Sequence, residues 1–326
     1  MRTSKQAFHL ADRAVMPEQT VPRSSTRTSA PRSARWKAIE QPITPPPTTT
    51  TLAPAAMPAR VREAAPLAWA GMRIKLVSDI HGAHGGLREA AAGADALLVC
   101  GDLVNLIDYR TMEGIAVEVF GREVTADFAR HRTAGRFEEA GRVLRGASEG
   151  REDQIREQVR TAVRAQYEAV FAAFPEPTYL THGNVDNPEQ FQDLLRPGVR
   201  HLDGEMVELD GLRVGFVGGG LPRGRRPHLS ECTHEEFAAK VAAVGPVDVL
   251  CSHMPPAVED LRFDVVAGRP EPGSQALLDY VEEHQPDYLY FGHVHQPRRS
   301  RLRVGRTWLV NVGYFRATGR MLDHPA

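Results

Sequence analysis

The stretch MRIKLVSDIHG, residues 72–82, is a short apolar run that ends in polar residues and glycine. Four later stretches have the same form: DALLVCGDLVN (95–105), TYLTHGNVD (178–186), VDVLCSHMPP (247–256) and DYLYFGHVHQP (287–297). Apolar runs of this length predict buried β-strands, and the switch to Asp, Asn or His beside Gly or Ser marks where each strand ends. We therefore expect five strand ends that present five polar clusters.

The composition is that of a soluble globular enzyme, with 326 residues, a formal net charge of −1 and 42% hydrophobic residues. No apolar run approaches the roughly 20 residues that span a bilayer. Cys100, Cys232 and Cys251 are an odd number at irregular spacings, which argues against a disulfide framework or a zinc knuckle. Buried free thiols in a reducing cytoplasm fit this pattern best. Neither the charge balance nor the hydropathy indicates a nucleic-acid or membrane partner, and the oligomeric state is left open.

Residues 1–71 are rich in Pro, Thr, Ser, Ala and Arg. Such a segment cannot bury enough apolar surface to offset its ordering entropy, so we expect a disordered tail before a folded region of residues 72–326. An alternative is that translation begins at Met72. A transit peptide is disfavoured because the segment lacks a clear amphipathic repeat.

A long polar stretch, about residues 105–177, separates the second and third predicted strands. Within it, the apolar residues of REDQIREQVRTAVRAQYEAVFAAF (151–174) recur at helical spacing: Ile155, Val159, Val163, Tyr167, Val170 and Phe171. This spacing predicts an amphipathic helix packed on the body of the protein. The residues before it predict further helix interrupted at glycines, so we interpret the whole stretch as a helical insertion that shapes or covers the substrate cleft.

Two hairpins are predicted after the third strand. MVELDGLRVGFVGGGLP (206–222) turns at Asp210 and Gly211, and RLRVGRTWLVNVGYF (301–315) turns at Gly305. Early strand–helix alternation followed by hairpins predicts mixed sheets packed face to face with helices outside.

The polar residues at the strand ends suit a metal centre when taken as a set, although each alone is an ordinary cap or loop residue. Carboxylate, imidazole and amide oxygen together suit Mn, Fe, Zn or Co. Small residues before most of them let the backbone approach closely. The candidate ligands are Asp79, His81, Asp102, Asn184, His253, His293 and His295.

The order Asp-x-His, Gly-Asp, Gly-Asn, His, Gly-His-x-His resembles the calcineurin-like metallophosphoesterase superfamily over about residues 72–314. The resemblance implies an α/β fold, a four-layer α/β/β/α sandwich, and two divalent metal ions. It implies one ion held by Asp79, His81, Asp102 and His295. It implies a second ion held by Asp102, Asn184, His253 and His293, with Asp102 bridging. Two such ions, roughly 4 Å apart, would share a bridging hydroxide that acts as the nucleophile on a phosphate ester.

The residues Gly183, Asn184, Val185 and Asp186 depart from the Gly-Asn-His-Asp or Gly-Asn-His-Glu of many superfamily members. In those members the histidine contacts the scissile phosphate and can protonate the leaving oxygen. General acid catalysis contributes about 10² to 10⁴ in rate, so its loss should penalise poor leaving groups most. A bacterial phosphodiesterase branch of the superfamily has Cys at this place, and the pattern here is similar. We therefore favour a phosphodiesterase over a phosphomonoesterase.

Some further residues are candidates for direct roles. His84 is preferred as a replacement acid over His182, which we interpret as structural because a neighbour of Gly183 often points away from its cluster. A Gly-rich loop after a predicted strand carries arginines suited to bidentate phosphate binding, with a solvated basic loop as the alternative. They are Arg223, Arg225 and Arg226.

Two other functions are weighed against a cytoplasmic enzyme with a small phosphorylated substrate. A nuclease related to double-strand-break repair exonucleases would share the metal motifs. That branch normally keeps the histidine that Val185 replaces, and no basic nucleic-acid face is evident. A catalytically inactive interaction scaffold would have no need of all seven candidate ligands. The sequence does not name the substrate or the native metals.

Overall fold

The computed structural model describes residues 71–223 and 230–325. The expectations for the N-terminal tail therefore lie outside the described residues except at Gly71, and so do Arg225 and Arg226.

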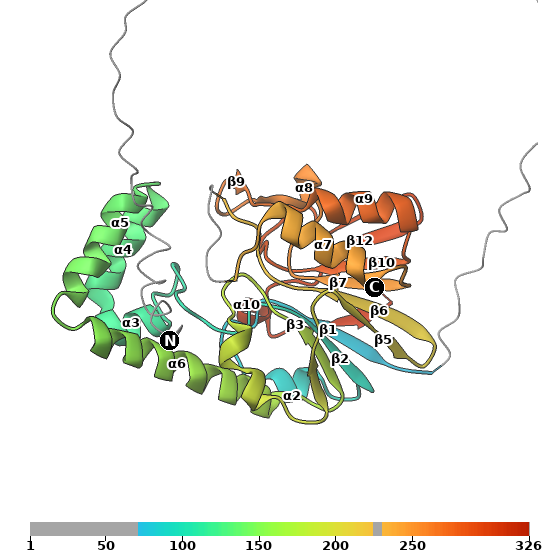
Figure 1. Ribbon diagram of the computed structural model, residues 1–326, viewed down its shortest axis with the longest axis horizontal. Helices are drawn as coiled ribbons and strands as arrows, with labels where there is room; N and C mark the ends of the chain where they lie inside the picture. Colours follow the sequence, from blue (N-terminus) through green and yellow to red (C-terminus); the bar gives the residue numbers. More distant parts are fainter. Residues whose placement is uncertain (1–70, 224–229, 326) are drawn as a thin grey trace, which may run out of the picture. The chain divides into compact units, whose positions relative to one another are not determined.

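The first sheet has the strand order β13-β1-β2-β3-β4 (Figure 1). Neighbouring strands from β1 to β4 are parallel, and β13 pairs antiparallel with β1. The first three predicted strands are therefore neighbours whose carboxyl ends lie at one edge of the sheet. The bounds are β1 Ile74–Val77, β2 Ala96–Cys100, β3 Thr178–Thr181, β4 Val199–His201 and β13 Leu322–His324.

The second sheet has the order β11-β12-β10-β7-β6-β5. Its four central strands are parallel, and its two edge strands are the outer arms of the predicted hairpins. At the first hairpin, Asp210 and Gly211 both have positive φ, 49° and 82°, which is the backbone that a tight two-residue turn requires. The bounds are β5 Glu205–Leu209, β6 Leu212–Val217, β7 Val249–Ser252, β10 Tyr288–Phe291, β11 Arg301–Val304 and β12 Thr307–Asn311.

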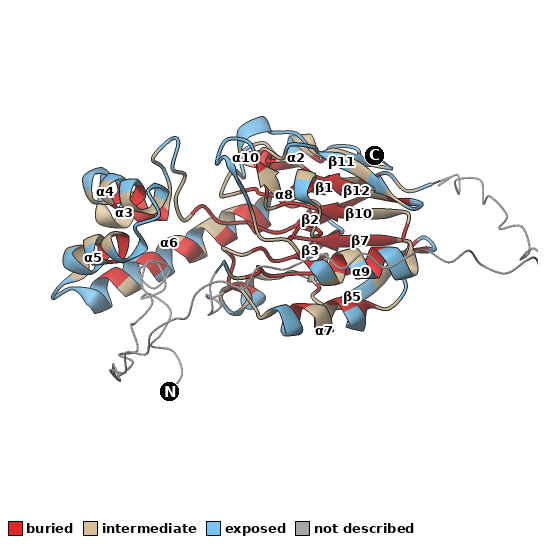
Figure 2. Cartoon of the chain, turned by 90° about the horizontal axis from the view of Figure 1, so that it is seen from above, coloured by how far each residue is buried: buried red, intermediate tan, exposed pale blue. Residues whose placement is uncertain are grey.

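Helices cover the outer face of each sheet, which confirms the four-layer α/β/β/α sandwich (Figures 1 and 2). Side chains alternate along each strand. Val77 and Val99 pack against α6 (Glu152–Ala173), whereas Cys100 contacts Cys251 of β7 between the sheets. Both cysteines are buried free thiols, as expected. The other helices on the sheets are α2 Leu87–Ala90, α7 His234–Val244 and α9 Gln275–His284.

The interval between β2 and β3 is helical, with α3 (Ile115–Phe120), α4 (Arg122–Thr133) and α5 (Phe137–Ser148) before α6. All six apolar positions predicted for the buried face of α6 are buried. The expected glycine breaks occur before and after α4, but α5 continues through Gly141 and Gly146. In Figure 1, α4 and α5 lie beside the N-terminal half of α6, and they share a small apolar cluster of their own.

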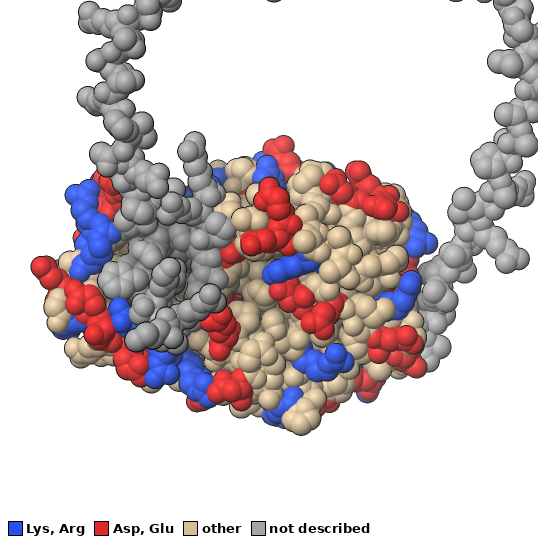
Figure 3. Space-filling model, viewed as in Figure 1, with Lys and Arg blue, Asp and Glu red and all other residues tan. Residues whose placement is uncertain are grey.

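Short elements complete the described chain. They are η1 Pro188–Gln190, η2 Gln192–Leu194, α8 Glu259–Arg262, β8 Phe263–Asp264, β9 Arg269–Pro270 and α10 Phe315–Thr318. Among the described helices, none is long and apolar enough to cross a membrane. On the described part of the face in Figure 3, positive and negative side chains are interspersed.

Candidate metal centre

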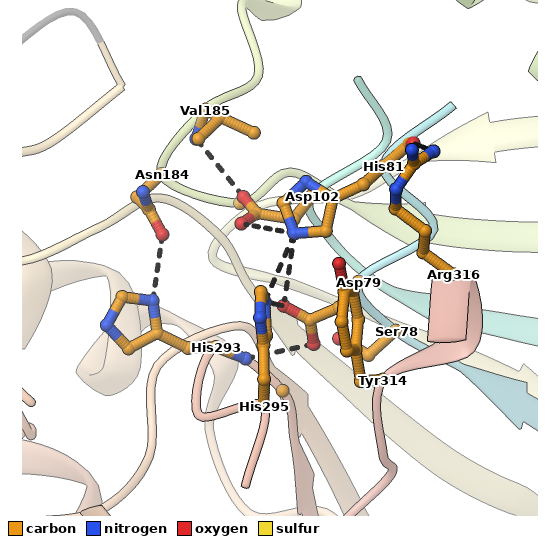
Figure 4. A network of polar contacts seen from close by, with 12 residues as sticks. Ser78, Asp79, His81, Asp102, Asn184, Val185, His293, His295, Tyr314 and Arg316 are labelled. Atoms are coloured by element: carbon orange, nitrogen blue, oxygen red, sulfur yellow. Dashed lines mark hydrogen bonds and ion pairs between the residues drawn. The ribbon is translucent and has the colours of Figure 1, made fainter. Parts of the chain in front are cut away.

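The seven candidate ligands meet at one edge of the sandwich, because each follows the carboxyl end of a parallel strand (Figure 4). The first sheet supplies residues after β1, β2 and β3, and the second sheet supplies residues after β7 and β10. In the described chain, ligand atoms of two groups lie within 4.8 Å of one another: Asp79, His81 and His295, and Asp79, Asp102 and His253.

In the first half of the centre, imidazole nitrogens surround buried carboxylates. Nε2 of His81 lies 3.2 Å from Nε2 of His295. Oδ1 of Asp79 lies 3.2 Å from His295 Nε2 and 3.8 Å from His81 Nε2. Oδ2 of Asp102 lies 3.6 Å from His81 Nε2. These are the four residues that the resemblance implied for one ion.

In the second half, Oδ1 of Asn184 lies 3.0 Å from Nε2 of His253 and 2.8 Å from Nδ1 of His293. The other carboxylate oxygen of Asp102, Oδ1, lies 3.4 Å from His253 Nε2. Asp102 therefore presents one oxygen to each half, which is the geometry that a bridging carboxylate requires.

Backbone carbonyls set the tautomers of two histidines. His81 Nδ1 lies 3.1 Å from the carbonyl oxygen of Val104, and His253 Nδ1 lies 2.9 Å from that of Cys100. Because a carbonyl only accepts hydrogen bonds, each Nδ1 must carry the hydrogen. In the neutral ring Nε2 then has a free lone pair, and both Nε2 atoms face the centre. This arrangement is typical of histidines that bind metal ions.

The residues present fit divalent cations. Oδ1 of Asp79 is buried with no hydrogen-bond partner among the described residues, and a cation would satisfy it. Burial opposes ionisation of Asp79 and Asp102, yet the surrounding imidazoles hold the pKa of both carboxyls below its usual range. Burial also opposes the charged form of His81, but the same carboxylates outweigh it and raise the pKa of His81 to about 9. The carboxylates thus attract positive charge to this half of the centre.

The backbone around the centre is unusual in a way that the sequence anticipated in part. Gly183 has no room for a side chain, because a Cβ there would collide with the Asp102 carboxylate. A Cβ on Gly101 would likewise collide with the backbone of Gly183. Strained left-handed conformations of non-glycine residues cluster at functional sites. Four candidate ligands have positive φ: Asp79 at 53°, His81 at 43°, Asp102 at 56° and His293 at 69°.

The model of the calcineurin-like phosphoesterase family matches residues 72–297. The chain belongs to this family. Its members are generally metal-dependent hydrolases, and the buried Asp/His clusters agree with that assignment.

Comparison with solved structures agrees with the family's fold. One structure is 16% identical, with 77% of this chain and 95% of its own covered and a TM-score of 0.50. A protein of Thermus thermophilus is 15% identical, with coverages of 77% and 97% and a TM-score of 0.46. An archaeal phosphodiesterase is 14% identical, with coverages of 76% and 88% and a TM-score of 0.33. No curated protein sequence matches the chain.

Asp186 organises the phosphoesterase centre although sequence reasoning assigned it no role. Its buried carboxylate accepts backbone N–H groups from Asp102 at 2.9 Å, Leu103 at 2.8 Å and Gly183 at 2.7 Å. Burial and the charge of Asp102 raise the pKa of Asp186 to about 6 in spite of these bonds. Its place directly after Val185 was the only signal in the sequence. The carboxylate ties the end of β2 to the end of β3.

Tyr314 and Arg316 support the first half of the centre from the C-terminal segment. The Tyr314 ring stacks on His295, with centroids 3.9 Å apart and planes 8° apart. Nη1 of Arg316 donates to the carbonyl oxygen of His81 at 3.0 Å, and Nε donates to Oδ2 of Asp108 at 3.3 Å. Because Asp108 precedes α3, this arginine links the beginning of the insertion to a candidate ligand. No sequence pattern pointed to either residue.

Val185 contributes its backbone but no proton donor from its side chain. Its N–H donates to Oδ1 of Asp102 at 3.1 Å, and its side chain packs against the apolar cluster under α6. His182 is buried with Nδ1 3.1 Å from Nε2 of His201, and burial lowers the pKa of His182 to about 3. His182 therefore lies in a separate polar contact, as expected for a structural histidine.

The remaining candidates have different outcomes. His84 is exposed, and its Nδ1 donates to the carbonyl oxygen of Gly82 at 3.0 Å. No described hydrogen bond or ion pair joins His84 to the seven ligands, so its role as an acid stays a prediction. Arg223 forms an ion pair with Glu271, a residue that also lies beside His293.

Proposed function

We propose that the protein is a dinuclear-metal-dependent phosphodiesterase that acts on a small phosphorylated substrate. The observation that supports this most directly is Asp102, whose two oxygens face two separate sets of nitrogen and oxygen ligands. Two divalent ions held there would activate water as a nucleophile and neutralise charge on the phosphoryl group.

The chain itself contributes preorganisation. The carbonyls of Val104 and Cys100 hold His81 and His253 with their free Nε2 lone pairs toward the centre, so no ring has to reorient before ions bind. Asp186 holds the backbone on both sides of Asp102. Preorganised groups of this kind stabilise developing charge without a cost in reorganisation during the reaction.

Val185 supports a diester substrate over an alkyl monoester. Its apolar side chain packs into the core, so it offers no proton to a leaving oxygen at this position. A leaving group that is already a stable anion, such as an aryl oxide, needs no such proton. The penalty of about 10² to 10⁴ in rate should therefore fall on alkyl esters.

Neither alternative function gains comparable support. A nuclease would favour a continuous basic surface, whereas positive and negative side chains are interspersed on the described part of the face in Figure 3. An interaction scaffold would gain nothing from a buried Asp79 oxygen that lacks a hydrogen-bond partner among the described residues. Such an atom costs stability unless a cation binds it.

The test compares the Mn²⁺-loaded protein with two variants, using bis(p-nitrophenyl) phosphate, p-nitrophenyl phosphate and an alkyl phosphomonoester. We expect the wild-type protein to hydrolyse the diester best. Val185→His should raise turnover of the alkyl monoester about 10-fold or more. Val185→Ala removes the same side chain without adding an acid and should not raise it.

Two results would count against the proposal. Equal alkyl-monoester turnover in the wild-type protein and in Val185→His would remove the explanation based on the missing acid. Stoichiometric metal binding without turnover of any ester would reject the enzyme. The pH–rate profile of His84→Ala decides the remaining question, because an unchanged acidic limb of kcat would exclude His84 from proton transfer.

A further inference from the structure

Glu271 is a carboxylate held beside the second half of the centre, although no motif includes it. Its side chain is only 12% exposed, and it follows β9 in the segment between α8 and α9. Its backbone N–H donates to the carbonyl oxygen of Arg262 at 2.7 Å, and Nη1 of Arg262 donates to its carbonyl oxygen at 3.2 Å. Oε2 of Glu271 lies 3.7 Å from Nε2 of His293.

His293 is fixed so that its two ring nitrogens have different surroundings. Its backbone N–H donates to Oδ2 of Asp79 at 3.0 Å, and its Nδ1 lies 2.8 Å from Oδ1 of Asn184. Figure 4 shows this nitrogen directed at Asn184 and the other ring nitrogen directed away from it. Nε2 is buried and has no hydrogen-bond partner among the described residues. Of the two nitrogens, Nδ1 is therefore the one placed to bind an ion.

The tautomer of His293 decides whether Nδ1 can bind an ion. With its hydrogen on Nδ1, the neutral ring would donate to Asn184 and turn the lone pair of Nε2 toward the Glu271 carboxylate, which is repulsive. With its hydrogen on Nε2, the ring directs positive charge at Glu271 and leaves the lone pair of Nδ1 free for a cation. Histidines that bind metal ions usually donate their second ring N–H to a carboxylate, carbonyl or water in this way.

The position of the Glu271 carboxylate does not depend on His293 alone. Arg223 pairs with the same Oε2 atom, and Nε of Arg269 lies 3.9 Å from Oε1. These arginines and the backbone contacts with Arg262 orient the carboxylate from the outer side. The ion pair also holds Arg223, a residue with a partly exposed side chain, close to the His293 half of the centre.

We propose that Glu271 is a positioning residue that selects the metal-binding tautomer of His293 and so strengthens binding of the second ion. This deepens the proposed function and rests on it in one respect, namely that an ion binds at Nδ1 of His293. The shortening of the 3.7 Å separation to a hydrogen bond is expected when an ion draws the lone pair of Nδ1, because the ring N–H then becomes a stronger donor.

The first experiment titrates the full chain with Zn²⁺ by calorimetry. Glu271→Ala should weaken one of the two binding events by about 10- to 100-fold and leave the other unchanged. Glu271→Gln keeps an oxygen that accepts the ring N–H and should recover part of the loss. Glu259→Ala is the matched control, because this α8 carboxylate has a 77% exposed side chain and should bind both ions like the wild-type protein.

The second experiment records the ¹⁵N signals of the imidazoles in the Zn²⁺-loaded protein. We expect His293 with its hydrogen on Nε2 and zinc at Nδ1, and a weakened or heterogeneous Nε2–H signal in Glu271→Gln. Unchanged affinity for both ions in Glu271→Ala would overturn the proposal, as would zinc at Nε2 of His293. If Glu271→Ala does not fold, the signals of the wild-type protein and Glu271→Gln still decide.

Both experiments report on metal binding and not on turnover, so the two proposals can fail separately. Selective weakening of one ion without hydrolysis of any ester would reject the phosphodiesterase and support the role of Glu271. Normal hydrolysis with unchanged binding of both ions would reject the role of Glu271 alone.

Discussion

Asp186 shows how one buried carboxylate can determine the geometry of a site without being a candidate ligand. The N–H groups that it accepts belong to residues on both sides of the centre, at the ends of β2 and β3. The motif around Val185 predicted that this turn matters, and it predicted Asn184 as the ligand. It could not predict Asp186, because two of the three hydrogen bonds join it to residues more than 80 positions away.

Replacing Asp186 should destabilise the protein strongly. Asp186→Ala leaves three buried N–H groups without a partner, and we expect the free energy of unfolding to fall by about 2–4 kcal/mol. Asp193→Ala, which removes a 64% exposed carboxylate from the same segment, should cost no more than about 1 kcal/mol. Urea denaturation of both variants measures the difference. Equal losses in the two would mean that the three hydrogen bonds do not support the fold.

The helix α6 shows what periodicity can and cannot reveal about an element. Its six apolar positions were predicted and are buried, because the spacing of 3.6 residues puts them on one face. The pattern does not say what each part of that face contacts. Tyr167 packs under the centre, and its Oη accepts the backbone N–H of Asn187 at 2.7 Å. The helix thereby holds the loop that carries Asn184.

The strand β13 contains a titratable contact between the two sheets. Nδ1 of His324 lies 2.8 Å from the hydroxyl of Tyr290 in β10, and burial lowers the pKa of His324 to about 4. Between pH 6.5 and 4 the unfolded chain therefore binds a proton that the folded chain does not. By linkage, the stability present above pH 6.5 is lost as the pH falls through this window.

We expect His324 to account for roughly 1 kcal/mol of the stability lost between about pH 7 and pH 4, after a discount for its partial exposure. His324→Gln removes the titration and should give a shallower pH dependence than the wild-type protein. Urea denaturation at several pH values measures both slopes, and other buried histidines such as His182 contribute equally to both proteins. Parallel slopes would show that His324 titrates alike in the folded and unfolded states.

The candidate centre joins the two halves of the whole molecule. Asp79, His81, Asp102 and Asn184 follow strands of the first sheet, and the three other histidines follow strands of the second. An ion bound between them would connect both sheets and stabilise only the folded state. Stability should therefore depend on metal concentration.

Divalent ions at about 100 times their dissociation constant should add roughly 2.7 kcal/mol of stability. For a domain of this size, that corresponds to a rise in Tm of about 5–10 °C. Differential scanning calorimetry of EDTA-treated protein, with and without Mn²⁺, measures the effect. Asp102→Ala should show a much smaller rise. An equal Tm in EDTA and in Mn²⁺ would contradict the assignment of these residues as ligands.

Strand ends, hairpin turns and the buried face of α6 follow from patterns among near neighbours in the chain, and the sequence alone was enough to predict them. The order of the motifs was likewise enough to indicate the family and to name the seven ligands. Their tautomers and supports depend on packing. The carbonyls of Val104 and Cys100, the ring of Tyr314 and the carboxylate of Glu271 act through contacts between distant segments. Hydrogen bonds and ring stacking depend on distance and direction, and these are set only when the two sheets and their connecting segments pack together.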